Sequence, residues 1–268
     1  VSGGFNLAGG NGWTNVSGRN YVAWNWKAGG AGSANTDGSI NTTATSVNTT
    51  AGFSISTYTG TGSAATIGHG LGVKPSMIIV KNLSSSSYGW YVYHKSIAAT
   101  HEILLNSSSA KDTTSQWNDT EPTSSVFSVG TAAATNGSGN NLVAYCFAEK
   151  TGYSKFGSYK GNGNADGTFV YTGFKPAFII IKGAISGDGN AGQNWELYDN
   201  KRLGYNVDNN SLLPSSSGTE NTGDRVDILS NGFKIRINSD GVNDNNSTYI
   251  YMAFGQSLVG SNNVPCTA

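Results

Sequence analysis

The sequence carries little charge. Lys and Arg number 16 in 268 residues, Asp and Glu also number 16, and the formal net charge is zero. Charged residues make up 12% of the chain, about half of their usual share in soluble domains. Nucleic acids are bound by concentrated basic surfaces, so this composition argues against a nucleic-acid partner.

Long hydrophobic runs and cysteines are also scarce. No stretch approaches the roughly 18 consecutive apolar residues of a membrane span, so we expect no membrane insertion. No basic segment followed by an apolar run marks a signal peptide. The two cysteines, Cys146 and Cys266, are too few for a disulfide framework and do not have the spacing of metal ligands.

Turn-forming residues are abundant. Gly, Asn, Ser and Thr together make up almost half of the chain. A disordered chain would be poor in aromatic and β-branched residues, but this one has 6 Trp, 13 Tyr and 10 Phe. The apolar residues form short runs between polar turns, which predicts antiparallel strands and hairpins.

Internal repeats organise the sequence. Residues 73–81 (VKPSMIIVK) match 174–182 (FKPAFIIIK), and residues 90–94 (WYVYH) match 195–199 (WELYD). Residues 20–26, 141–147 and 248–254 form a third set of similar segments. The order of the matches is preserved at an offset of about 100 residues, which is the signature of tandem copies of one domain.

The predicted fold is therefore all-β, with tandem antiparallel β-sandwich repeats, lectin-like or jelly-roll-like, of about 100 residues each. We expect a closing hairpin of a preceding repeat at 1–27, a Gly/Ser/Thr/Asn linker at 28–51, repeats at 52–150 and 153–260, and a polar tail at 261–268. The apolar runs at 77–80 and 178–181 predict strands buried on both faces. One helical turn is expected near 97–105.

Catalytic and metal sites have little support in the sequence. His69, His94 and His101 lack further ligands at metal spacing, and we interpret them as turn or surface residues. No Gly-x-Ser-x-Gly elbow is present. The loops at 188–190 and 240–246 offer oxygen ligands for calcium, but Asn, Asp and Gly are also the residues that turns require. We expect no catalytic residue, no metal and no cofactor.

Glycan hydrolysis requires two carboxylates across a cleft. The candidate pairs are Asp119 with Glu121, Glu196 with Asp199, and Asp224 with Asp227. None recurs as a pair in the other copy, and Glu196 is interpreted as a solvent-facing strand residue because it alternates with Trp195 and Leu197. The chain is therefore not expected to be an enzyme.

Aromatic residues divide into two classes. Those that recur in both copies, Trp90 with Trp195 and Tyr58 with Tyr159, are expected to pack cores. Those that do not recur are candidates for glycan binding, since rings among short polar side chains suit sugar faces and hydroxyls. These candidates are Tyr88, Trp117 and Tyr205.

The chain resembles a repeated β domain of tail-fibre-like and structural proteins of tailed bacteriophages, notably marine and cyanobacterial phages. The segments that carry the resemblance are 21–30 (YVAWNWKAGG), 68–75 (GHGLGVKP) and 143–149 (VAYCFAE). The resemblance implies an extracellular location in the virion, at the tail fibre, and a homotrimer.

The resulting hypothesis is a receptor-binding protein that attaches the virion, without catalysis, to a host cell-surface polysaccharide. Its other partners would be virion tail proteins. A purely structural component, such as a fibre spacer or a capsid decoration protein, is the alternative, and a glycan depolymerase is a third.

Overall fold

The structure is a computed structural model that describes residues 4–7, 14–185, 192–202, 206 and 209–255. Within these residues the chain forms strands β1 to β16 and one short helix, α1 (Ala133–Asn136). Neighbouring strands in every sheet run antiparallel. The predicted all-β, antiparallel fold class is confirmed.

The first half of the chain forms a seven-stranded sheet and a two-stranded sheet. The large sheet has the order β1 (Ala44–Asn48), β2 (Phe53–Thr59), β9 (Asn141–Phe147), β4 (Met77–Asn82), β5 (Trp90–His94), β6 (His101–Leu104) and β7 (Asp112–Thr113). The small sheet pairs β3 (Ala65–Gly68) with β8 (Val126–Val129).

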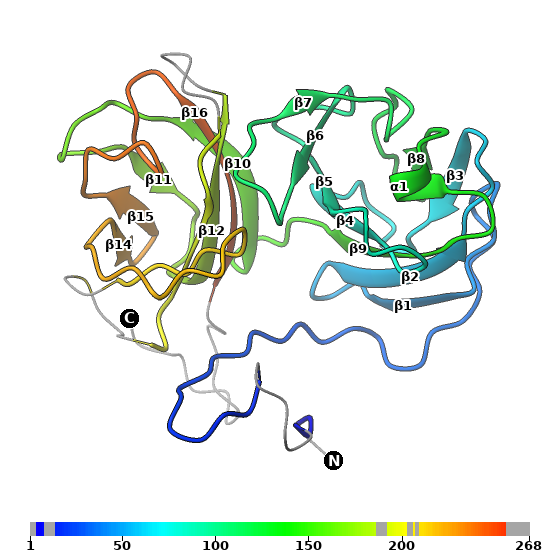
Figure 1. Cartoon of the computed structure of the whole chain (residues 1–268), viewed down its shortest axis with the longest axis horizontal. Coiled ribbons are helices and arrows are strands. Elements are labelled where there is room, and N and C mark those ends of the chain that lie inside the picture. The colour runs from blue at the N-terminus through cyan, green and yellow to red at the C-terminus, as the bar shows by residue number, and fades with distance from the viewer. Residues whose placement is uncertain (1–3, 8–13, 186–191, 203–205, 207–208, 256–268) are drawn as a thin grey trace.

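The second half forms a four-stranded and a three-stranded sheet and lies beside the first half (Figure 1). The four-stranded sheet has the order β10 (Ser154–Lys160), β16 (Thr248–Gly255), β12 (Pro176–Ile185) and β13 (Trp195–Asp199). The three-stranded sheet has the order β11 (Phe169–Tyr171), β15 (Gly232–Ile235) and β14 (Val226–Leu229).

The two large sheets share a strand order and a register. β2, β9, β4 and β5 lie in the same sequence of neighbours as β10, β16, β12 and β13. Ile78 lies opposite Cys146 in the first sheet, and Ile179 lies opposite Ala253 in the second. Two copies of one domain would produce this correspondence; the repeat bounds at 52–150 and 153–260 stay a prediction.

Three hydrophobic cores lie between the layers. The first core contains Ile78 and Val80 of β4, and the second core contains Ile179 and Ile181 of β12. The central core joins the halves. It contains the residues of β4 and β12 that point to the opposite face of each strand, such as Met77. Both strands are therefore covered on both faces, as their continuous apolar runs predicted.

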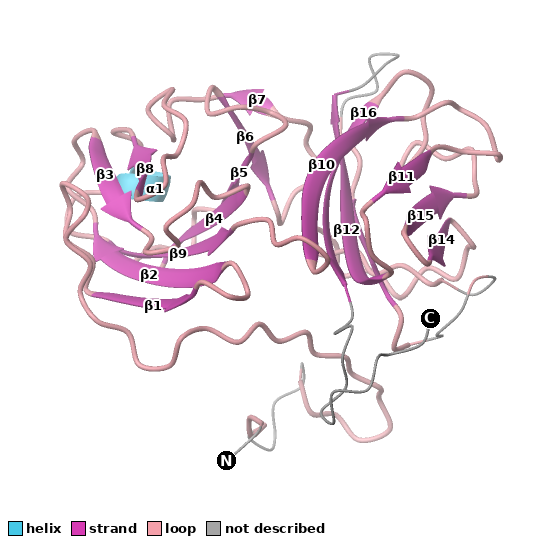
Figure 2. Ribbon diagram, turned by 180° about the vertical axis from the view of Figure 1, so that it is seen from behind, coloured by secondary structure: helices cyan, strands magenta, loops and turns pink. Residues whose placement is uncertain are grey.

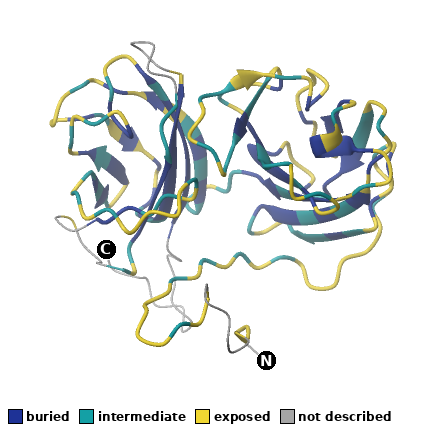
Figure 3. Ribbon diagram, in the orientation of Figure 1, coloured by how far each residue is buried: buried dark blue, intermediate teal, exposed yellow. Residues whose placement is uncertain are grey.

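The central core packs one large sheet against the other. Figure 2 shows the sheet of β10, β16 and β12 on the side of the second half that faces the first. Buried residues follow the large sheets, and exposed residues gather on the outer loops (Figure 3). The molecule is thus a stack of a small sheet, two large sheets and another small sheet.

The N-terminal segment does not form the expected hairpin. Residues 4–7 and 14–27 contain no strand. Trp26 instead packs edge to face against Phe147, Phe178 and Phe254, with ring centroids 5.2 to 6.1 Å apart. The alternating aromatic residues of segment 20–26 predicted a strand. In the structure the rings of Trp24 and Trp26 pack on the central core instead.

The predicted linker at 28–51 is wrong for its C-terminal part. Residues 44–48 form β1, which pairs with β2, and the side chain of Ile40 is buried in the first core. The Thr45 hydroxyl contacts the hydroxyls of Thr42 and Ser56 at 2.9 and 3.0 Å. The backbone hydrogen bonds to β2 hold this strand in the sheet. Its buried hydroxyl groups form hydrogen bonds with one another, so the strand can be buried with few apolar side chains.

The helical turn expected near 97–105 is also wrong. Residues 101–104 form β6, where Ile103 lies opposite Val92 and both side chains are buried. Pairing with β5 outweighs the local preference of this short segment. The helix of the described chain is α1, between β8 and β9.

Candidate functional site

A polar pocket of about 370 Å³ opens in the second half, between β13 and the loop that follows β15. We call it the polar pocket. Its polar lining includes Asn194, Glu196, Asn221, Arg225, Ser239 and Asp240. The volume falls within the range of about 300 to 1,000 Å³ that is common for small-ligand sites.

A buried ion pair forms the floor of the polar pocket. The side chain of Glu196 on β13 is 4% exposed, and its Oε1 accepts a hydrogen bond from Arg225 Nη1 at 2.7 Å. The Tyr198 hydroxyl donates to Oε2 of the same carboxylate. Burial, reinforced by the negative charge of Glu196, holds the pKa of Tyr198 well above its usual range, so this hydroxyl remains a donor.

The residues that line the polar pocket include polar groups without a hydrogen-bond partner among the described residues. Arg225 Nε is buried without a hydrogen-bond partner among the described residues. Asp240 is exposed at the rim, and its carboxylate makes no hydrogen bond within the described part of the chain. An unpaired buried donor costs about 1–3 kcal/mol, whereas the exposed Asp240 carboxylate is accessible to a ligand hydroxyl.

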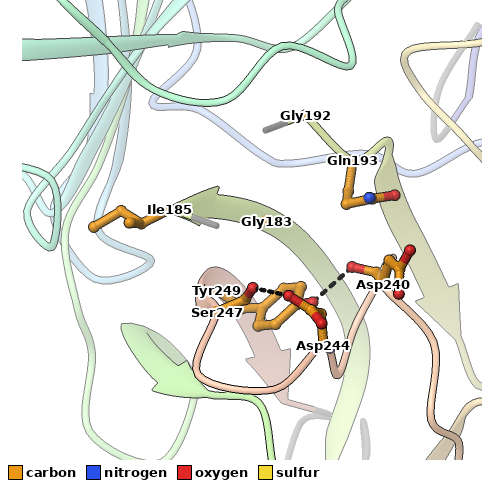
Figure 4. A pocket seen from close by; sticks show the side chains of 8 residues that line it. All are labelled: Gly183, Ile185, Gly192, Gln193, Asp240, Asp244, Ser247 and Tyr249. Carbon is orange, nitrogen blue, oxygen red and sulfur yellow. Dashed lines mark hydrogen bonds between the residues drawn. The ribbon is translucent and has the colours of Figure 1, made fainter. Parts of the chain in front are cut away.

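The loop that carries Asp240 is fixed by close packing. A Cβ on Gly241 would lie 2.3 Å from Glu196 Oε1, so only glycine fits against the carboxylate. Beneath the loop lies a cavity of about 10 Å³, shown in Figure 4, which is about the size of one water molecule. The Tyr249 hydroxyl donates to the Asp240 carbonyl at 2.6 Å and accepts from the Asp244 amide at 2.8 Å.

The charge of the polar pocket selects among ligands. Glu196 and Asp240 contribute two negative charges, and Arg225 contributes one positive charge. The resulting local charge of about −1 opposes anions. Amides, hydroxyls and a rim carboxylate together suit a neutral ligand rich in hydroxyl groups.

Comparison with known proteins identifies the family. A family model described as Domain of unknown function (DUF7483) matches residues 1–257. The chain belongs to the DUF7483 family. No curated protein and no solved structure matches the chain.

In this DUF7483 chain the aromatic residues predicted to bind glycan do not form one site. Trp117 is 2% exposed and packs against Tyr93 in the first core, so its prediction as a binding surface is wrong. Asn118 and Asp119 adopt positive φ, which makes the turn that follows the buried ring. Tyr88 is half-buried, and Tyr205 lies outside the described residues.

The aromatic residues expected to pack cores are confirmed with one exception. Tyr58, Tyr159 and Trp195 are buried. Trp90 is half-buried and packs beside the central core against Tyr145, with ring centroids 6.2 Å apart. Recurrence between copies therefore identified packing residues well.

At least one member of each candidate carboxylate pair makes a structural contact, and in the third pair Asp227 pairs with Arg236 at 3.2 Å. Glu121 accepts hydrogen bonds from Lys74, Tyr93 and the amide of Ala99. Asp199 is buried and pairs with Arg202 at 2.7 Å.

The predicted pair of Glu196 with Asp199 does not line one pocket. The two residues are three positions apart on β13, and successive side chains of a strand point to opposite faces. The interpretation of Glu196 as a solvent-facing residue is wrong, because Arg225 and Tyr198 stabilise its carboxylate in a buried position.

Two histidines are buried rather than at the surface. His69 is fully buried and holds its turn, since its Nδ1 accepts the Leu71 amide at 3.2 Å. His94 is 1% exposed, and its Nε2 contacts the carbonyl oxygen of Tyr251 in the other half at 3.2 Å. Burial lowers the pKa of both imidazoles, that of His94 to about 4.

The described residues contain neither a cluster of metal ligands nor a membrane-spanning helix. The described chain contains no group of three or more His, Cys, Asp or Glu side chains that could hold a metal ion. The loop at 188–190 lies outside it. No helix in the described ranges is long and apolar enough to cross a membrane.

The polar pocket itself was missed by sequence reasoning. The available signal was Glu196, a carboxylate between Trp195 and Leu197 in a chain with few charges. Its partner Arg225 is 29 residues away along the chain. The pairing depends on the fold and has no local pattern.

Proposed function

We propose that this DUF7483 protein is a receptor-binding protein of a phage virion, located at the tail fibre, which attaches without catalysis to a host cell-surface polysaccharide. The observation that carries the proposal is the polar pocket, with an exposed rim carboxylate, amide and hydroxyl side chains in its lining, and a local charge that favours neutral, hydroxylated ligands. The phage assignment rests on the sequence resemblance of residues 21–30, 68–75 and 143–149.

Assembly would strengthen weak attachment. The resemblance implies a homotrimer joined to other virion tail proteins, and three linked sites gain avidity of the order of 10² to 10⁴ over one site. A stack of sheets with little charge and three apolar cores suits a protein exposed on a virion.

The test is binding of the fluorescently labelled protein to candidate host cells, with and without their surface polysaccharide. Saturable binding that disappears with the polysaccharide is expected. Asp240→Ala should weaken it about tenfold, or 1.4 kcal/mol, because a rim acceptor is lost. Asp224→Ala is the matched control, since Asp224 is an exposed carboxylate outside the polar pocket. Absence of binding to every host of the parent virion would instead favour a fibre spacer or capsid decoration protein.

Glycan hydrolysis is a second candidate, because Glu196 and Asp240 line the same pocket. Both oxygens of Glu196 already accept hydrogen bonds, from Arg225 and Tyr198, which suits a fixed acceptor better than a proton donor. Incubation with host polysaccharide should release no reducing sugar. Release of reducing sugar that disappears in Glu196→Gln and Asp240→Asn would show that the protein hydrolyses the polysaccharide and does not only attach to it.

A further inference from the structure

A second pocket lies where the two halves join, and we call it the junction pocket. It has a volume of about 270 Å³. Its lining residues come from the connection between β9 and β10, from the start of β10, and from the end of β11; they include Glu149, Thr151, Lys155, Tyr171, Thr172 and Gly173. None of them lines the polar pocket.

Tyr171 gives the junction pocket an aromatic surface. Its side chain is 64% exposed, because Val170 is the residue of β11 that points into the second core. The backbone at Gly173 runs against the ring: a Cβ there would lie 3.6 Å from the Tyr171 hydroxyl oxygen. An exposed ring with a hydroxyl at its edge offers an apolar face and a polar group to the same ligand.

Lys155 gives the junction pocket a positive charge that is paired only loosely, with Glu149. Glu149 Oε1 accepts a hydrogen bond from the Phe156 amide at 2.9 Å and pairs with Lys95 at the same distance. Lys155 Nζ lies 3.7 Å from that oxygen, too far for a hydrogen bond. Its side chain is 43% exposed. Glu149 and Lys155 line the junction pocket, and their charges cancel; with Lys95, which pairs with Glu149 from outside the lining, the three charged groups sum to about +1.

We infer that the junction pocket binds a carboxylated sugar, a hexuronate unit of the polysaccharide, with the pyranose ring on Tyr171 and the carboxylate at Lys155. The inference rests on the proposed attachment function and adds a glycan class to it. The lining of the polar pocket carries a net charge of about −1, whereas Glu149, Lys95 and Lys155 at the junction pocket together carry about +1, so the two sites favour neutral and acidic units respectively.

The test is calorimetric titration of the full chain, at low ionic strength, with an oligomer of glucuronic acid. A glucose oligomer of the same linkage and length is the neutral comparison. The acidic oligomer should bind about tenfold more tightly than the neutral one. Tyr171→Ala should weaken the binding of the acidic oligomer about tenfold, and Lys155→Gln should bring the acidic-to-neutral affinity ratio close to one.

Two variants serve as matched controls. Phe169 is exposed on the same side of β11 and Lys160 is exposed on β10, but neither lines the junction pocket. Phe169→Ala and Lys160→Gln should leave both affinities unchanged. Equal losses in control and test variants, or no preference for the acidic oligomer in the unaltered protein, would overturn the inference.

Failure of this inference differs from failure of the attachment function. If the unaltered protein binds host cells through polysaccharide but has no preference for the acidic oligomer, the junction site is wrong and attachment stands. If it binds neither cells nor oligomers, both are wrong.

Discussion

Single buried asparagines hold equivalent loops in both halves. Asn243 Nδ2 donates to the carbonyls of Asn164 and Ile237, at 2.7 and 2.9 Å, and its Oδ1 accepts the Asn162 amide at 3.0 Å. Asn136 makes the corresponding bonds in the first half, to the carbonyls of Ser63 and Gly130 and from the amide of Thr61. Each asparagine side chain forms hydrogen bonds with loop backbone groups that have no strand partner.

We expect Asn243→Ala to lower the free energy of unfolding by about 2–4 kcal/mol, because buried backbone groups lose their partners. Urea denaturation followed by fluorescence measures the change. Asn245→Ala, at an exposed position two residues further on, should change it by less than about 0.5 kcal/mol. Similar effects for both variants would show that the amide bonds do not hold the loop.

His94 predicts a dependence of stability on pH. Its pKa is lowered to about 4 by burial, whereas an unfolded histidine has a pKa of about 6.5. Between these values the unfolded chain binds more protons, so stability falls as the pH falls from about 6.5 to about 4. Lys95 and Glu149 are the charged groups that act on the imidazole.

The contribution of His94 to this dependence should be about 3 kcal/mol over the window. Urea titrations of the unaltered protein and of His94→Gln, at several pH values between 4 and 7, isolate it as the difference between two slopes. Parallel pH profiles would mean that His94 does not account for the acid sensitivity.

At the level of elements, the N-terminal segment that carries Trp24 and Trp26 lies across the two large sheets, and we call it the strap. Trp24 donates from Nε1 to Asp199 at 3.3 Å, and Trp26 packs on phenylalanines of β9, β12 and β16. Both rings border an apolar cleft of about 370 Å³ between the sheets. The strap therefore covers part of the central core.

Trp26→Ala should destabilise the protein by about 2–4 kcal/mol, somewhat less than a fully buried tryptophan, because Trp26 is only half-buried. Thermal denaturation measures the loss, and Trp26→Phe should recover much of it by keeping an aromatic contact. A loss below about 0.5 kcal/mol would show that the strap does not contribute to the central core.

At the level of the whole molecule, the central core makes the two halves one folding unit. Met77, Ile79 and Phe147 of the first half meet Phe178 and Phe254 of the second in this core. Each fully buried side chain of this size contributes about 1.5–3 kcal/mol. The Lys182 ammonium adds a polar link, since it donates to the Ser108 carbonyl of the first half at 2.8 Å.

We therefore expect a single cooperative unfolding transition, although the chain contains two similar sandwiches. Differential scanning calorimetry should give equal calorimetric and van't Hoff enthalpies. The fragment 1–152 alone should expose its half of the central core and associate or aggregate. Two separate transitions, or a monomeric and cooperative fragment, would show that the halves fold independently.

The sequence by itself determined the all-β class, the strand runs buried on both faces, and the recurring aromatic residues of the cores. These follow from local periodicity and from the match between copies, both of which are carried by neighbouring residues. The tertiary structure decided the position of β1, the burial of Trp117 and His94, and the pairing of Glu196 with Arg225. β1 is held by its pairing with β2, Trp117 packs against Tyr93, and His94 contacts the other half at Tyr251. Each depends on the folded surroundings of the residue, which local periodicity does not contain.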